Sequence, residues 1–208
     1  MPLKRRFFSL LFKSYKLLAF WRKKDCKKVK KIRLSNAVRA EFFAVAVLGR
    51  WLATELKADP APRMYACDAS QMGWAIVDQP TGSGFINDTG LAEDPFETIV
   101  LRSRPWRLRK RRRFKRRLDH ILSGEICAFR QTVNIASREN AGRDIIIYTD
   151  NSNIYYSVKK GRSSVYRLNT LCQHILVAER TYDVRIHVRW CGTKSQPADI
   201  YTRDKLPS

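Results

Sequence analysis

Long apolar runs and patterned cysteines are both missing from this chain. Its five cysteines, Cys26, Cys67, Cys127, Cys172 and Cys191, are odd in number and show neither CxxC spacing nor a Cys/His cluster suited to zinc. We expect reduced, mostly buried thiols. Lys13 and Lys16 interrupt the apolar N-terminal stretch, and no other segment approaches the ~18 residues of a membrane span. The sequence therefore predicts a soluble protein of a reducing compartment, with no membrane partner.

Acidic residues are also scarce relative to basic ones. Lys and Arg number 41 against 19 Asp and Glu, which gives a formal net charge of +22 over 208 residues. Such an excess goes far beyond what solubility requires and is typical of a protein with a polyanionic partner, for which nucleic acid is the default. Because 44% of the residues are apolar and 11% are aromatic, the chain is no disordered basic tail. We expect one compact domain with an appendage.

The appendage is the N-terminal segment 1–34, whose first 24 residues contain no acid. Basic residues alternate there with bulky apolar ones, a pattern that suits a mitochondrial presequence. The same basic character continues through KKDCKKVKKIR, which equally suits nuclear import or RNA binding. Three interpretations remain: a retained basic arm, a cleaved presequence or a solvated face. The expected location is the nucleus or the mitochondrion.

Hydrophobic periodicity predicts an α/β domain over 63–208. An amphipathic helix over 35–57, in a connection segment that reaches residue 62, is expected to pack onto it. Strands are expected at 64–68, 73–78, 97–102, 144–150 and 184–190, and helices at 119–137, 151–159 and 165–178, with Ser195 capping a last short helix. The order β-β-β-α-β-α-α-β-α predicts an antiparallel meander joined to parallel strands in one sheet.

Four acidic residues carry the chemistry: Asp68, Glu125, Asp150 and Asp199. Glu125 lies on the apolar face of its predicted helix and Asp68 lies in a strand that looks buried, so both need a partner, a proton or a metal. Asp150 and Asp199 have plainer alternatives, as a helix cap and as a charge at a helix N-terminus. If one sheet carries all the strands, the four carboxylates can converge at one edge. Hard oxygen ligands select Mg²⁺ or Mn²⁺, and two such ions can hydrolyse a phosphodiester.

The motifs DASxxGW, HIxxxExxA, TDN and ADxxxR, in this order, resemble the type 1 ribonuclease H domain of retroelement reverse transcriptase polyproteins, in its DIRS-like and pararetrovirus-like branch. The resemblance covers roughly 63–205, and LGRWL before it looks like the connection between reverse transcriptase and ribonuclease H. It implies a ribonuclease H-like fold with a five-stranded mixed sheet flanked by helices. Where that branch has Asn before the last AD this chain has SQP, and Thr202 stands where Ser is common.

By this resemblance Asp68 bridges two Mg²⁺ ions, for which Mn²⁺ can substitute, Glu125 and Asp150 complete the site of one, and Asp199 holds the other. The implied reaction is hydrolysis of the RNA strand of an RNA/DNA hybrid, leaving a 5′-phosphate and a 3′-hydroxyl. Ser70 and Asn151, beside two of the acids, are candidates for contacting the RNA backbone or its 2′-hydroxyls.

A basic insertion at 102–117 is the largest departure from that family, with 11 basic residues in 16 positions. Two aromatic residues lie among the cations, so the segment can neutralise phosphates and stack on bases. The candidate nucleic-acid-binding residues here are Arg102, Arg104, Trp106, Arg107, Arg109, Lys110, Arg111, Arg112, Arg113, Lys115, Arg116 and Arg117.

Two functions from different classes follow. The first is an active metal-dependent endonuclease acting on RNA/DNA hybrids, either a retroelement fragment that works with a reverse transcriptase or a host protein derived from one. The second is a domesticated ribonuclease H-like protein that binds structured RNA in a ribonucleoprotein such as an organellar ribosome. A transposase or integrase of the wider superfamily fits the TDN and AD contexts less well.

Overall fold

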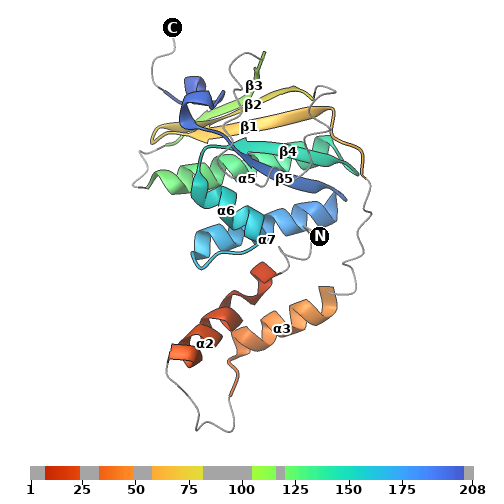
Figure 1. Cartoon of the computed structure of the whole chain (residues 1–208), viewed down its shortest axis with the longest axis vertical. Helices are drawn as coiled ribbons and strands as arrows, with labels where there is room; N and C mark the ends of the chain where they lie inside the picture. Colours follow the sequence, from red (N-terminus) through yellow and green to blue (C-terminus); the bar gives the residue numbers. More distant parts are fainter. Residues whose placement is uncertain (1–7, 24–32, 49–57, 82–104, 116–119, 204–208) are drawn as a thin grey trace.

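A computed structural model describes residues 8–23, 33–48, 58–81, 105–115 and 120–203. One five-stranded sheet in the order β3-β2-β1-β4-β5 forms its centre (Figure 1). Strands β1 (Arg63–Ala69), β2 (Gly73–Pro80) and β3 (Arg107–Arg113) form an antiparallel meander, and β4 (Asp144–Thr149) and β5 (Arg185–Trp190) run parallel to β1. The expected α/β class with a mixed five-stranded sheet, the sheet of a ribonuclease H-like fold, is confirmed.

Three helices cover one face of this sheet: α5 (Ile121–Glu139), α6 (Ser152–Lys160) and α7 (Tyr166–Thr181). Their apolar stripes supply Phe129, Ile154 and Leu171 to a core that also contains Tyr65 and Ile147 from the strands. The opposite face carries a smaller apolar cluster, which is covered by the C-terminal turn η5 (Asp199–Tyr201). The positions of these helices agree with their predicted ranges to within a few residues.

The third strand of the meander differs from the prediction. The apolar run at 97–102, which was expected to form it, lies outside the described residues. The strand that pairs with β2 is instead RLRKRRR, the central part of the basic segment. Because β3 lies at the sheet edge and is exposed along nearly its whole length, its residues need no apolar alternation. The basic segment is thus, over 107–113, part of the sheet itself.

Close packing of β3 against β2 depends on Gly73. A Cβ atom built on Gly73 would lie 2.6 Å from the backbone oxygen of Arg112, closer than real Cβ contacts allow. The backbone N–H of Phe114 donates to the carbonyl of Met72 just beyond this point, at 2.8 Å. A side chain at residue 73 would therefore push the end of β3 away from the sheet.

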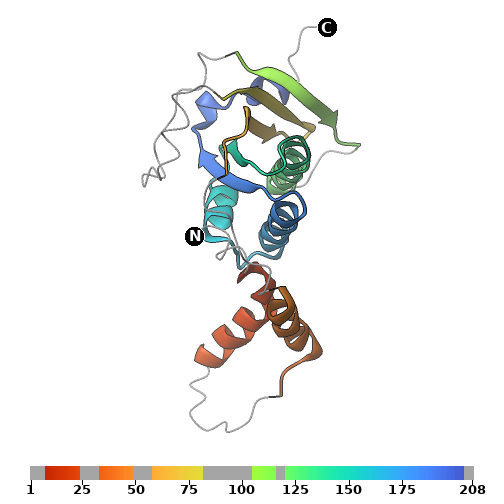
Figure 2. The same cartoon turned by 90° about the vertical axis from the view of Figure 1, so that its right-hand side faces the viewer.

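The N-terminal helices form a separate layer below α7. The turn η1 (Phe8–Leu11) leads into α2 (Phe12–Lys23), which lies beside α3 (Asn36–Leu48) in both views (Figures 1 and 2). The Glu41 carboxylate of α3 accepts hydrogen bonds from the backbone N–H groups of Lys13 and Ser14 and so caps α2. Two α7 side chains, Asn169 and Gln173, donate to the carbonyl of Ser9 at 2.7 and 3.1 Å.

This arrangement corrects the expectation that the helix of the connection segment packs onto the domain. The helix α3 packs mainly on α2 and η1, and η1 is the part that meets α7. Within the predicted apolar stripe Val38 is buried, but Phe42 is 49% exposed. Residues 49–57, which hold the rest of that stripe, lie outside the described residues.

The C-terminal segment also differs in detail. Ser195 does not cap a helix: it is the last residue of the short 3₁₀ turn η4 (Thr193–Ser195), and Ala198 precedes η5. Gln196, part of the SQP sequence, donates from its side-chain amide to the carbonyl of Cys67 at 3.1 Å. This hydrogen bond holds the segment before Asp199 against β1, one residue from Asp68.

In the described part of the chain, no helix is both long enough and apolar enough to cross a membrane. The described cysteines carry no disulfide. Cys67, Cys172 and Cys191 are buried, and Cys127 is half-buried.

Candidate metal centre

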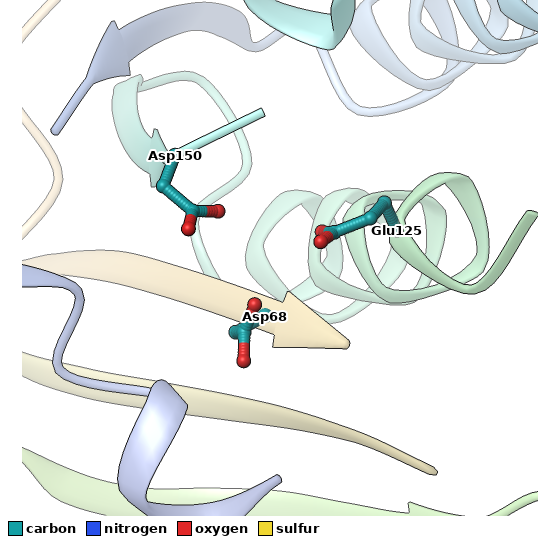
Figure 3. Close-up of side chains that lie close together, drawn as sticks. All are labelled: Asp68, Glu125 and Asp150. Atoms are coloured by element: carbon teal, nitrogen blue, oxygen red, sulfur yellow. The ribbon is translucent and has the colours of Figure 1, made fainter. Parts of the chain in front are cut away.

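Three carboxylates meet where β1 and β4 end. Asp68 is the last residue but one of β1, Asp150 follows β4 directly, and Glu125 lies in the second turn of α5. Because β1 and β4 are adjacent and parallel, their carboxyl ends lie at the same edge of the sheet, and α5 crosses the face beside them. One oxygen of each side chain lies within 4.8 Å of the others (Figure 3). We call Asp68, Glu125 and Asp150 the acid cluster.

Burial and mutual repulsion disfavour the charged forms of this cluster. Asp68 and Glu125 are only 5% and 7% exposed. Burial, together with the charges of Asp68 and Asp150, raises the pKa of Glu125 from its ordinary 4.5 to about 9. Burial also raises the pKa of Asp68 from 3.8 to about 7, with Asp150 and Asp199 adding to the shift, and it raises the pKa of Asp150.

Within the described ranges, no salt bridge neutralises the acid cluster. Thr202 donates its hydroxyl to Asp68 Oδ2 at 2.5 Å, which holds that carboxylate in place. Asp150 Oδ1 is buried and has no hydrogen-bond partner among the described residues, although hydrogen bonds of the same carboxyl group with the Thr193 and Gln196 side chains partly oppose the rise of its pKa. A hard divalent cation fits these observations, because the cluster offers only oxygen ligands, one of them an unpartnered buried atom.

The fourth acid, Asp199, lies outside this cluster. Its carboxylate binds the guanidinium of Arg203 four residues later, at 2.6 Å and 2.8 Å. Its charge nevertheless raises the pKa values of Asp68 and Asp150, so it lies close enough to act on both electrostatically. Convergence of the acids thus holds for three of the four, and the metal-binding role of Asp199 stays a prediction.

Ser70 and Asn151 both have hydrogen bonds that shape the backbone next to the cluster. The Ser70 hydroxyl accepts from the backbone N–H of Met72 at 3.1 Å, inside the turn that joins β1 to β2. Asn151 is the N-cap of α6, where its side-chain oxygen accepts from the N–H of Ile154 at 3.1 Å. Because Asn151 caps the helix, Asp150 does not, and this removes the plainer explanation for Asp150. Contact of either residue with RNA stays a prediction.

The basic residues of β3 fall into two groups. Near its start, Arg107 and Arg109 point toward Asp78, a fully buried carboxylate of β2 that also binds Arg63 at 3.2 Å. Arg109 forms a further ion pair with Glu139 at the end of α5. These two arginines therefore hold the edge strand to the domain, and Asp78 is a structural residue that sequence reasoning missed. The one feature of the sequence that could have indicated Asp78 is its position as a charged residue in an otherwise apolar strand.

The other group, Arg111, Arg112 and Arg113, lies at the end of β3 near the acid cluster. Asp68 pairs with Ala75, and Ala75 pairs with Arg111, so these three residues form one row across the sheet. Two strand spacings separate Asp68 from Arg111, about 10 Å between their Cα atoms. Residues in one row share a face, so Arg111 lies on the same face of the sheet as Asp68. No ion pair of this group appears among the described residues.

Both aromatic residues of the basic segment contribute to packing. Trp106 is half-buried and meets the ring of Tyr148 edge to face, with centroids 6.4 Å apart. Phe114 packs against the main core. Stacking of either ring on a base is untested. Arg102, Arg104, Arg116 and Arg117 lie outside the described residues, and Lys110 and Lys115 are exposed.

No family model matches this chain. No curated protein matches it either. Among solved structures, it is similar to one of a foamy viral protease-reverse transcriptase in complex with an RNA/DNA hybrid, with a TM-score of 0.39 and 12% sequence identity. The match covers 72% of this chain and 21% of that one, so the chain spans about a fifth of its neighbour's length. The evidence for the function of this chain therefore lies in its own acid cluster.

Proposed function

We propose that this protein is a metal-dependent endonuclease that hydrolyses the RNA strand of RNA/DNA hybrids. The observation that supports this proposal most strongly is the acid cluster: two buried carboxylates and one half-buried carboxylate lie within 4.8 Å of one another, and no cation of the described residues forms a salt bridge with them. Placing like charges together in a buried position costs stability, which a structural role would not explain. Binding of divalent cations compensates for that cost.

Asp68, Glu125 and Asp150 would hold the metal, with Asp68 central because its strand β1 packs against both β4 and α5. Asp199 would join them only after its carboxylate leaves Arg203. Bound Mg²⁺ or Mn²⁺ would supply an activated water and stabilise negative charge on the phosphodiester. The elevated pKa values of the cluster mean that metal binding must displace protons from it.

Arg111, Arg112 and Arg113 would bind phosphates of the hybrid next to the scissile bond. Arg111 shares a row with Asp68, about 10 Å away, and Arg112 and Arg113 follow it on β3, so one nucleic-acid strand would reach both the cations and the acid cluster. Such contacts bind sugar-phosphate backbone of any sequence. Selection of RNA would then depend on groups near the acid cluster, with Asn151 and Ser70 as the candidates for contacting a 2′-hydroxyl.

A second function, docking on structured RNA within a ribonucleoprotein, draws support from where the other charges lie. The basic helix α2 is far from the acid cluster, on the other side of α7 (Figure 1). A short hybrid held at the cluster would not need cations there. This second function uses the same β3 residues but requires no metal.

The deciding experiment is incubation of the purified full chain with a labelled RNA/DNA hybrid in Mg²⁺. We expect RNA fragments that end in a 3′-hydroxyl and begin with a 5′-phosphate, and no product in excess EDTA. Asp150→Asn should lower the rate by at least about 10³-fold, because it removes one of the three clustered carboxylates that would hold the metal. Asp183→Asn is the matched control, since Asp183 is exposed and its positive φ of 51° suits Asn.

Intact hybrid after long incubation of folded protein in Mg²⁺ and in Mn²⁺ would refute the nuclease. Cleavage that Asp150→Asn leaves unchanged would mean that a contaminating enzyme is responsible.

A further inference from the structure

A cavity lies at the junction between the N-terminal helices and the domain. It has a volume of about 460 Å³ and is lined by α2, the end of α6 and the turn that leads to α7. Its size is in the range of small-molecule and cofactor sites. All of its lining residues belong to the described part of the chain.

The charge of this cavity has one sign. Lys16 of α2, Lys160 of α6 and Arg162 line it, and no acidic residue does among the lining residues that the structure describes. None of the three cations takes part in a salt bridge between described residues. Converging cations without counter-charge, beside a serine hydroxyl, are suited to a phosphate group.

Aromatic rings complete the cavity. The guanidinium of Arg162 lies 4.2 Å from the ring centroid of Tyr15, so a cation of the domain stacks on a ring of α2. Tyr156 is exposed, and the ring of Tyr155 supports it edge to face at 5.2 Å. An exposed, supported ring next to phosphate-binding cations can stack on a nucleobase.

We propose that this cavity binds a nucleoside phosphate, with the phosphate on Lys160 and Arg162 and the base on Tyr156. Ser163 adds a hydroxyl beside the phosphate; its oxygen already accepts from the N–H of Val165, which orients it. The helix α6 begins two residues after Asp150 and ends at Lys160, so its nine residues put the cavity about 13 Å from the acid cluster. The ligand is thus either a free nucleotide or an unpaired nucleotide of a strand that extends from the cluster.

Binding can be tested without cleavage. The full chain carrying Asp150→Asn is titrated in EDTA with adenosine 5′-monophosphate, and separately with a short single-stranded oligoadenylate. Lys160→Gln and Tyr156→Ala should each weaken binding of the cognate probe at least about tenfold, as expected for loss of a charge-assisted hydrogen bond or a stacking contact. Both residues are exposed, and both variants should keep the fold, as judged by circular dichroism.

The control is Arg39→Ala with Arg143→Ala, which removes two exposed arginines that do not line the cavity. It should change binding of the monophosphate less than twofold. If the Lys160→Gln and Tyr156→Ala variants weaken binding of the oligonucleotide alone, the natural ligand is a nucleotide of a strand. If they weaken binding of both probes, the natural ligand is a free nucleotide. Binding of neither probe, equal loss in the control, or displacement of the monophosphate by an equal concentration of inorganic phosphate would overturn the proposal. Because cleavage plays no part, these outcomes do not depend on the proposed nuclease.

Discussion

Acidic and basic side chains lie two strands apart in one sheet, and they differ in how far they are exposed to solvent. Two members of the acid cluster at the end of β1 are buried and the third is half-buried, and no cation of the described residues forms a salt bridge with them. The cations at the end of β3 are exposed or half-buried on an edge strand and cost little, because water solvates them. The clustered acids therefore require a functional explanation, whereas the exposed cations are compatible with several functions. We therefore expect substitutions in the acid cluster to have larger effects than substitutions at the end of β3.

The largest expected effect concerns Asp68. Asp68→Asn should abolish hydrolysis of the hybrid, by at least about 10³-fold, while the metal-free protein becomes equally or more stable because one repelling charge is gone. Thermal unfolding in EDTA, beside the cleavage assay, measures both quantities. A large loss of stability would mean that Asp68 pairs structurally and that the comparison between the two regions is mistaken. Asp183→Asn again serves as the control.

A smaller effect is expected at the other end of the row. Replacing Arg111, Arg112 and Arg113 with Ala should weaken hybrid binding and reduce the salt dependence by about one unit of slope per lost phosphate contact. Cleavage at saturating protein should survive. Arg107→Ala is the matched control, since Arg107 faces Asp78 and should affect stability more than the salt slope.

The same triple variant separates the two proposed functions. If these residues dock on structured RNA, the variant should lose co-sedimentation with large RNA particles whether or not a hybrid is present. Unchanged hybrid affinity together with unchanged co-sedimentation would make the end of β3 a solvated face.

A last effect concerns the pH dependence of stability. The folded protein raises the pKa of Glu125 from 4.5 to about 9, so between these values the folded state holds a proton that the unfolded state has lost. The free energy of unfolding should therefore fall as pH rises through this window, by up to about 1.4 kcal/mol per pH unit, and level off above it. In urea unfolding in EDTA from pH 5 to 9, Glu125→Gln should remove the slope between pH 7 and 9, whereas below pH 7 Asp68, whose pKa is raised to about 7, keeps a slope of the same sign. Parallel curves for the two proteins would contradict the burial and the repulsion that together raise the pKa of Glu125.

Much of the fold and three of the site residues could be predicted from the sequence. DIIIYT contains a continuous apolar run and is followed directly by an acid, Asp150, and the helix 121–139 has an acid on its apolar stripe. Each pattern indicates both an element and a carboxylate at a defined place on it. The parallel pairing of β1 with β4 then brings Asp68 and Asp150 together, because the carboxyl ends of parallel neighbours share one edge.

Sequence patterns did not identify β3. Strand prediction relies on apolar alternation, and RLRKRRR has none, because an edge strand needs only backbone hydrogen bonds to one neighbour and can expose both faces. The sequence also did not show which arginines of β3 form ion pairs within the domain and which do not. Arg109 binds Glu139 from a helix 30 residues away, and Arg111 does not, although the two are next but one in sequence.

By itself the sequence determined the α/β class, the order of the main helices and strands, the strong positive charge and the identity of the acids, since these depend on composition and local periodicity. Only the tertiary structure decided which of those charges meet. It directs Arg107 toward buried Asp78, and Arg162 of the domain onto Tyr15 of α2. The physical reason is that an ionised side chain takes whichever partner the fold brings within a few ångströms, and that distance is not encoded in local periodicity.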